Sequence, residues 1–177
     1  MAYLRLTVRC TASTVPRWAQ TKLGELHGVI TGELASRSGL VWAHGIGGSC
    51  IADDARGLGM LLSQTASQCR VFRVDLRGHG RSAMMHDDAR SFKQYKWSEL
   101  ACDLQSAAHS AFPRAFFGGE ASGAAVALHA AVAAAAGPAS PMPSGIVLMR
   151  PPFPWGGREV WKIRYALAAS GAERDGL

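Results

Sequence analysis

The chain has 177 residues, 48% of them hydrophobic and 18% charged, and its mean hydropathy is +0.04. This is enough apolar material for one folded domain, and it excludes extended disorder. The net charge of +6 comes from arginines scattered along the chain, without the basic cluster or interleaved aromatic residues that a nucleic-acid partner needs.

The first 24 residues have basic, serine and threonine side chains but no acid, because the first acidic residue is Glu25. This composition is typical of an organellar transit peptide. The alternation of residues 3–8 favours an edge strand instead. We therefore expect residues 1–24 to be an N-terminal extension or an edge strand, and residues 25–177 to form the domain.

The four cysteines show neither a paired spacing nor a neighbouring histidine pattern, so the sequence predicts free thiols and no metal site. Free thiols are typical of a reducing compartment. We expect a cytoplasmic protein, or an organellar one if residues 1–24 are a transit peptide. No cofactor is expected.

Strand and helix patterns alternate along the rest of the chain. The apolar spacing predicts strands at residues 26–31, 39–43, 70–74, 114–118 and 145–149, and helices at 53–67, 97–109, 121–136 and 158–169. Ser98 is the expected N-cap of the second helix. The alternation indicates an α/β fold with a mostly parallel, doubly wound sheet and flanking helices. The alanine-rich stretch at 121–136 is too short for a bilayer, so we expect no membrane span.

Glycine-rich motifs follow three of the predicted strands. Residues 44–48 read HGIGG, residues 75–82 read DLRGHGRS, and residues 119–123 read GEASG. The last motif has the glycines of a nucleophile elbow, a sharp strand-to-helix turn that presents its middle side chain. That middle residue is Ala121, and a methyl group cannot act as a nucleophile.

In order and spacing, these motifs resemble those of the α/β-hydrolase family, and especially its serine esterases and lipases, from about residue 39 to residue 158. The resemblance implies the N-terminal part of that fold, with Ala121 at the nucleophile position. It also implies an oxyanion hole made by the backbone amides of Ile46 and Ser122. The other residues that it places in the elbow and the loop are His44, Gly45, Gly47, Gly119, Glu120 and Gly123.

The acid and the histidine of that family follow the nucleophile in chain order. Here no histidine follows His129. We therefore expect a truncated and catalytically inactive hydrolase domain. One alternative is a noncatalytic module that binds a small acyl or ester ligand in the residual oxyanion pocket. The other is a fragment or variant of an active carboxylic-ester hydrolase.

Several other side chains have both a functional and a structural interpretation. We expect Ser122 to open a helix, because no base is available to make it a shifted nucleophile. His44 is expected to organise its loop by hydrogen bonding, and His79 with Asp75 to hold a structural turn. Phe153 and Trp155 are equally suited to a small acyl pocket and to the core.

The last predicted strand, at residues 145–149, is an uninterrupted apolar run. Strands of this kind are usually buried inside a parallel sheet. No further strand is predicted after it, so we expect an open apolar edge, and possible self-association through that edge.

Overall fold

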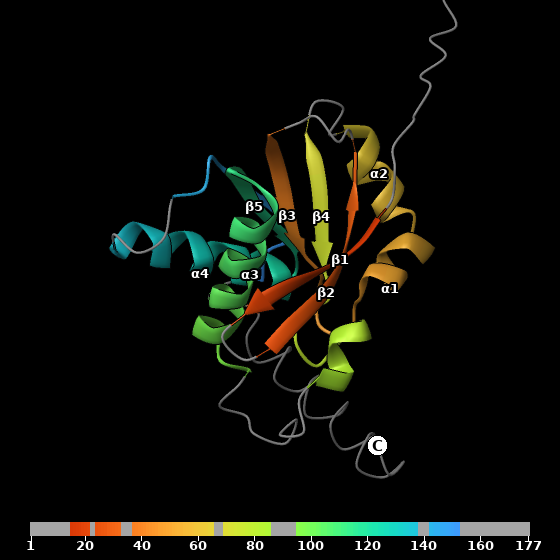
Figure 1. The fold of residues 1–177 in the computed structure, drawn as a ribbon, viewed down its shortest axis with the longest axis horizontal. Coiled ribbons are helices and arrows are strands. Elements are labelled where there is room, and N and C mark those ends of the chain that lie inside the picture. Colours follow the sequence, from red (N-terminus) through yellow and green to blue (C-terminus); the bar gives the residue numbers. More distant parts are fainter. Residues whose placement is uncertain are drawn as a thin grey trace, which may run out of the picture.

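A computed structural model of the chain describes residues 15–21, 24–32, 37–65, 69–85, 95–137 and 142–152. These residues form one six-stranded sheet with helices on both faces (Figure 1). In chain order the elements are β1 (Val15–Thr21), β2 (Gly24–Thr31), β3 (Ser38–Ala43), α1 (Cys50–Ala55), α2 (Leu58–Thr65), β4 (Arg70–Val74), the short 3-10 helix η1 (Gly80–Met85), α3 (Trp97–Ala111), β5 (Arg114–Glu120), α4 (Ser122–Ala136) and β6 (Ile146–Met149).

The spatial order of the strands is β1-β2-β4-β3-β5-β6. The pairs β1/β2 and β2/β4 are antiparallel, and the pairs from β4 through β3 and β5 to β6 are parallel. After β3 the chain forms β4 on one side of β3. It then crosses back and forms β5 on the other side of β3. Strand order therefore reverses beside β3, where the carboxyl ends of parallel strands form the usual binding crevice of such sheets. The arrangement confirms the predicted α/β class.

The core has two layers because successive side chains of a strand point to opposite faces. On one face Val41, Phe72 and Phe117 pack with the buried residues of α3 and α4. On the other face Leu40, Trp42 and Val71 pack with Leu58 of α2. This alternation fixes the register of the central strands, since a shift by one residue would expose both sets.

The prediction of one helix over residues 53–67 is wrong in its extent. Two helices replace it, and they are separated at Gly57, whose φ of 74° is a left-handed conformation that glycine adopts easily. The first of them, α1, begins earlier than predicted because the Ser49 hydroxyl accepts a hydrogen bond from the Ala52 amide (3.1 Å).

The prediction that Ser98 caps the second helix is also wrong. That helix, α3, begins at Trp97 and has Lys96 as its N-cap, without a side-chain cap hydrogen bond. The Lys96 carbonyl accepts hydrogen bonds from the amides of Glu99 and Leu100 (3.0 and 3.1 Å). Ser98 is therefore an exposed residue inside the first turn.

Strand β1 falls within residues 1–24 and pairs with β2 along its whole length, from Val15 opposite Ile30 to Thr21 opposite Gly24. Residues 3–8, the helix predicted at 158–169, and the pocket candidates Phe153 and Trp155 lie outside the described residues. Among the described helices, none is long and apolar enough to span a bilayer.

Candidate functional site

The chain turns sharply between β5 and α4, and Ala121 is the residue at the turn. Its φ of 52° and ψ of −117° are rare for a residue with a side chain and cost on the order of 1–3 kcal/mol. Its amide donates to the Met149 carbonyl of β6 (2.9 Å), and its carbonyl accepts from the Ala124 amide (3.0 Å). Bonds on both sides thus hold the strained turn and present the Ala121 methyl group at the carboxyl end of β5.

Two glycines make this turn sterically possible. A Cβ atom on Gly123 would overlap the Ala43 carbonyl oxygen and would lie 2.5 Å from that of His44. A Cβ on Gly119 would overlap the backbone of Gly123. The first turn of α4 therefore packs directly on the end of β3, which no larger residue at either position permits.

The glycine-rich loop after β3 lies beside the elbow. A Cβ built on Gly45 would lie 3.5 Å from the Ala121 methyl group. The Gly48 amide donates to the Gly45 carbonyl (2.9 Å), and Gly47 has a φ of 73°. This tight turn leaves the side chain of Ile46 62% exposed.

His44 holds the loop in place, in the structural role predicted for it. Its ring is buried, and its Nδ1 donates to the Gly45 carbonyl (2.7 Å) while its Nε2 accepts from the Leu76 amide (3.0 Å). These two bonds require the neutral ring with its proton on Nδ1. Burial lowers the pKa of His44, which favours the same neutral form. Both ring nitrogens are occupied, so His44 is not a free base.

The N-terminus of α4 supplies amide groups at the elbow. The first helical bonds to Ala121 come from the amides of Ala124 and Ala125, so the amides of Ser122 and Gly123 stand outside the helical ladder. The helix dipole gives this end a partial positive charge. Such a helix end can stabilise a negative charge. The assignment of Ser122 and Ile46 to an oxyanion hole stays a prediction.

A charged network that the sequence did not indicate lies next to the elbow. Glu120 is 6% exposed and lies between Arg56 (3.0 Å) and Arg150 (3.4 Å). Arg56 also bonds Asp53 within α1 (2.6 Å). Glu120 thereby ties the end of β5 to α1 and to the residue after β6. Its carboxylate therefore has two cationic neighbours.

Asp75, at the end of β4, accepts hydrogen bonds from three directions. Its carboxylate receives the amides of Cys50 (2.6 Å) and Arg81 (3.1 Å) and the Nδ1 proton of His27 (2.8 Å). Burial acts to raise the pKa of Asp75, but these donors outweigh it and the pKa is lowered. His79 bonds the nearby Arg77 carbonyl (3.1 Å). The contacts agree with the structural turn predicted for this motif.

His27, Cys50 and Asp75 bring three possible metal-ligand atoms within 4.8 Å of one another. Their protons are already used in hydrogen bonds, since the Cys50 thiol donates to the Arg73 carbonyl (3.3 Å) and His27 donates to Asp75. Burial is the main cause of a strongly raised pKa at Cys50, which keeps the thiol protonated. In this protonated state the three side chains form a buried, hydrogen-bonded cluster of the core.

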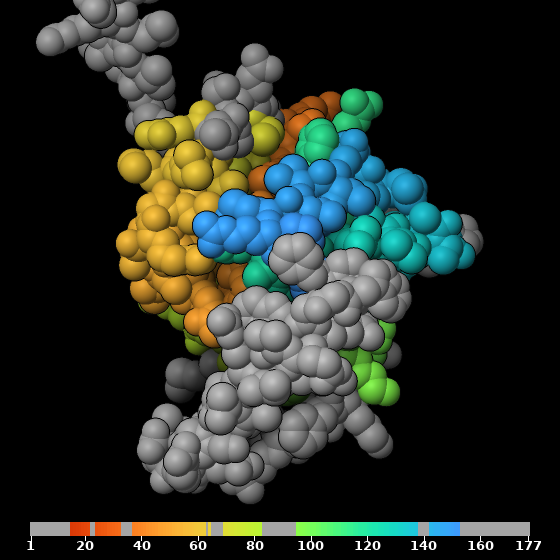
Figure 2. Space-filling model, turned by 180° about the vertical axis from the view of Figure 1, so that it is seen from behind, coloured from red at the N-terminus to blue at the C-terminus, as the bar shows by residue number. Residues whose placement is uncertain are grey.

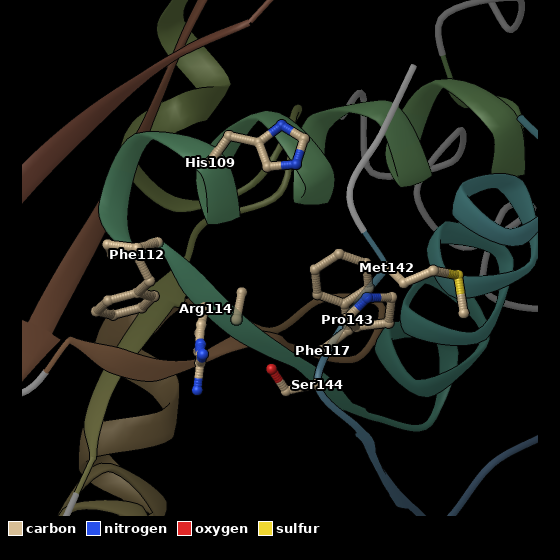
Figure 3. Close-up of a pocket in the computed structure, with 9 residues that line it drawn as sticks. His109, Phe112, Arg114, Phe117, Met142, Pro143 and Ser144 are labelled. Atoms are coloured by element: carbon tan, nitrogen blue, oxygen red, sulfur yellow. The ribbon is translucent and has the colours of Figure 1, made fainter. Parts of the chain in front are cut away.

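A small cavity of about 60 Å³ lies at the opposite end of β5 from the elbow (Figure 3). The last turn of α3 with Phe112, the start of β5 with Arg114, and residues 142–144 line it. Because the elbow is at the carboxyl end of β5 and this cavity is at the amino end, the cavity is not part of the candidate site.

Comparisons with known proteins agree with this geometry. The sequence model of the alpha/beta hydrolase family matches residues 40–175. No curated protein sequence matches the chain. An epoxide hydrolase from an endophytic Streptomyces superposes with a TM-score of 0.59 at 22% identity, over 76% of this chain and 36% of its own. A proline iminopeptidase-related protein from Thermus thermophilus superposes with a TM-score of 0.60 at 20% identity. The superposition covers 78% of this chain and 45% of that protein.

Epoxide hydrolase A from Mycobacterium thermoresistibile is 26% identical, with a TM-score of 0.55, over 67% of this chain and 35% of its own. The chain thus spans less than half the length of these three structures. The family match covers three quarters of the chain, and the loop after β3 and the elbow after β5 lie within it. The protein therefore belongs to the alpha/beta hydrolase family.

Proposed function

We propose that this chain is a noncatalytic member of its family with respect to ester hydrolysis by a covalent mechanism. The observation that carries the proposal is Ala121 at the turn of the elbow. In serine hydrolases of this fold, that position supplies the hydroxyl that attacks the carbonyl carbon. Removing the nucleophile from a catalytic triad lowers turnover by roughly a millionfold.

Ser122 does not replace the missing hydroxyl in this proposal. It is the first residue of α4, one position beyond the residue that the turn presents. His44 in the adjacent loop has both ring nitrogens in hydrogen bonds. A serine without a base to remove its proton is a poor nucleophile.

A fluorophosphonate probe tests this proposal because it labels activated serines. We expect no labelling of the unaltered chain, and the same background in Ser122→Ala. Labelling that is lost in Ser122→Ala would overturn the proposal and identify a shifted nucleophile. Ala121→Ser tests the alternative that the chain is a variant of an active carboxylic-ester hydrolase, which predicts a gain of labelling and of p-nitrophenyl acetate hydrolysis.

The geometry also favours a second candidate function, the binding of a small carboxylate or acyl ligand. The Ser122 and Gly123 amides stand outside the α4 ladder, at the positive end of the helix dipole. The Gly45 loop lies against Ala121, so a ligand oxygen there would be close to both segments. These donors belong to the main chain, and the change from serine to alanine leaves them in place.

Thermal unfolding with butyrate and with butyramide tests this candidate. A ligand that binds only the folded state raises the melting temperature as its concentration rises. We expect stabilisation by butyrate and less by the uncharged butyramide. Ser122→Ala removes only the hydroxyl and keeps the main-chain amide, so it should retain the effect. Equal responses to the two compounds would contradict recognition of the carboxylate.

A further inference from the structure

Three side chains with metal-ligand atoms meet inside the fold. His27 belongs to β2, Cys50 is the first residue of α1, and Asp75 directly follows β4. Figure 2 shows α1 and α2, in orange to yellow, on the outer surface, whereas these three residues are only 3%, 2% and 1% exposed. His27 and Asp75 are 48 residues apart in the sequence, so no local spacing of histidines and cysteines could indicate the cluster.

The spacing of the three ligand atoms is close to that of a zinc site. A ring nitrogen of His27, the Cys50 sulfur and an Asp75 oxygen all lie within 4.8 Å of one another, and His27 Nδ1 is 2.8 Å from Asp75 Oδ2. Tetrahedral zinc has bond lengths of about 2.0–2.3 Å, which place neighbouring ligand atoms about 3.3–3.6 Å apart. The observed separations fall on both sides of this value, so shifts of about 1 Å complete the geometry.

We propose that His27, Cys50 and Asp75 form a structural binding site for one zinc-like divalent cation. The charges favour a divalent ion, because a thiolate, a carboxylate and a neutral imidazole sum to two negative charges. Burial penalises a thiolate without a counter-charge, and a cation bonded to the sulfur removes that penalty and deprotonates the thiol. Imidazole and thiolate ligands suit zinc, whereas magnesium and calcium prefer oxygen.

The ion replaces protons in a balanced way. The Cys50 thiol, which donates to the Arg73 carbonyl (3.3 Å), releases its proton to solvent. The Nδ1 proton of His27 moves to Nε2, which is buried and has no hydrogen-bond partner among the described residues. Trp18 packs edge to face with the His27 ring, with centroids 5.0 Å apart, and an aromatic face accepts an N–H weakly. One proton is therefore released for each ion bound.

Backbone hydrogen bonds hold the ligands in place before an ion arrives. The Asp75 amide donates to the His27 carbonyl (2.8 Å), and the Cys50 amide donates to Asp75 Oδ1 (2.6 Å). The His27 amide donates to the Ser82 hydroxyl (2.9 Å). The Arg73 carbonyl oxygen, 3.3 Å from the Cys50 sulfur, can serve as the fourth ligand. A closed set of four protein donors is typical of structural zinc sites, and here the ion would join β2, α1 and β4.

Cobalt(II) spectroscopy tests the site directly, because cobalt accepts the ligand set of zinc and a cobalt–thiolate bond has a charge-transfer band in the near ultraviolet. We expect one cobalt ion per chain, with that band and the visible bands of tetrahedral coordination. Cobalt is added to the folded full chain and, separately, during refolding from urea, since buried ligands admit an ion slowly. Zinc binds such sites more tightly than cobalt, so it should displace the cobalt and remove the bands.

Serine substitutions identify the thiol that binds the ion. Cys50→Ser keeps the size of the side chain and a hydrogen-bond donor but removes the sulfur, so the charge-transfer band should be lost. The matched control replaces Cys10, Cys69 and Cys102 by serine and leaves Cys50 as the only thiol, so that triple variant should keep the band. His27→Gln should weaken cobalt binding at least about tenfold, which is the usual effect of losing even an outer partner of a metal ligand. Circular dichroism melts establish that each variant is folded.

The release of one proton gives a second, independent readout. The cobalt affinity should rise about tenfold per pH unit between about pH 6 and pH 8. An ion that binds only the folded state should also raise the melting temperature as its concentration rises. Any of four results would overturn the proposal: no charge-transfer band by either route of addition, a band that persists in Cys50→Ser, a band that is lost in the folded triple variant, or an affinity that does not depend on pH.

Discussion

Ala121 combines a chemically inert side chain with a strained backbone. Its φ of 52° and ψ of −117° are held by bonds to Met149 and from Ala124. In an active hydrolase such strain presents the nucleophile. Here the same conformation presents a methyl group, and the strain lowers the stability of the fold.

We therefore expect Ala121→Gly to stabilise the fold. Glycine adopts this conformation without steric penalty, and the relief of strain exceeds the added entropy of the unfolded chain. The free energy of unfolding should rise by about 1 kcal/mol in urea denaturation. The control is Ala125→Gly, inside α4, where glycine should lower it by about 1 kcal/mol. Destabilisation by both variants would show that the turn is not strained.

His44 gives the protein a predictable dependence of stability on pH. Burial lowers its pKa from the ordinary value of 6.5, so the folded state favours the neutral ring. Above pH 6.5 both states are neutral and the contribution is complete. As the pH falls below 6.5, the unfolded chain binds a proton before the folded chain does, and stability is lost until the folded pKa is passed.

The matched variant is His44→Gln, which does not titrate in this range. We expect its unfolding free energy to fall less steeply between pH 6.5 and pH 5 than that of the unaltered chain. The maximal difference in slope is about 1.4 kcal/mol per pH unit. Urea denaturation at several pH values measures both slopes, and equal slopes would contradict a neutral, buried His44.

At the scale of the elements, the strands β2 to β6 were predictable because their residues follow simple apolar patterns, whereas β1 at Val15–Thr21 was missed. The predictions at residues 39–43 and 70–74 match β3 and β4 to within one residue. The helix at 53–67 was mispredicted because its apolar spacing continues across Gly57, whose positive φ ends one helix before the next begins. Where α3 starts depends on the Lys96 carbonyl and not on the hydroxyl of Ser98, which a capping rule alone cannot reveal.

The junction of β3, β5 and α4 depends on Gly123 more than helix propensity indicates. Alanine is normally a better helix residue than glycine. At position 123, however, its Cβ would overlap the Ala43 carbonyl oxygen. We expect Gly123→Ala to lower the free energy of unfolding by about 1–3 kcal/mol, because two backbones must separate.

Gly137→Ala is the control for that prediction. It lies at the other end of the same helix, and among the described residues no atom lies within 4 Å of the point that its Cβ would occupy. Its φ of −151° suits alanine, so stability should be unchanged or higher by up to about 1 kcal/mol. Chemical denaturation compares the two variants. Equal effects would show that α4 does not pack as tightly on β3 as the structure indicates.

For the whole molecule, the candidate site was predictable in its local motifs and not in its long-range contacts. The elbow and the glycine loop each occupy a few consecutive residues. The bonds that support them join His27 to Asp75, 48 residues apart, and Arg77 to Asp103, 26 residues apart. A single sequence does not indicate which acidic side chain pairs with which basic side chain. The one available signal was Asp103 among the apolar positions of α3, where an acid needs a buried partner.

Arg77 and Asp103 connect the turn after β4 to α3. Their side chains are each 2% exposed and form two hydrogen bonds, of 2.6 and 2.5 Å. Removing one partner of a buried ion pair takes away much of the compensation for the other buried charge. We therefore expect Asp103→Ala to lower the free energy of unfolding by about 3–5 kcal/mol.

The double variant Arg77→Met with Asp103→Leu separates that penalty from the net value of the pair. Both buried charges are then absent, and apolar side chains of similar volume fill the space. Such replacements are often neutral or stabilising, so we expect the double variant to be more stable than Asp103→Ala. Urea denaturation of both variants supplies the comparison. If the double variant were the less stable of the two, the pair would be a net contributor to stability. If Asp103→Ala lowered the free energy of unfolding by less than about 1 kcal/mol, the two charges would not be buried together.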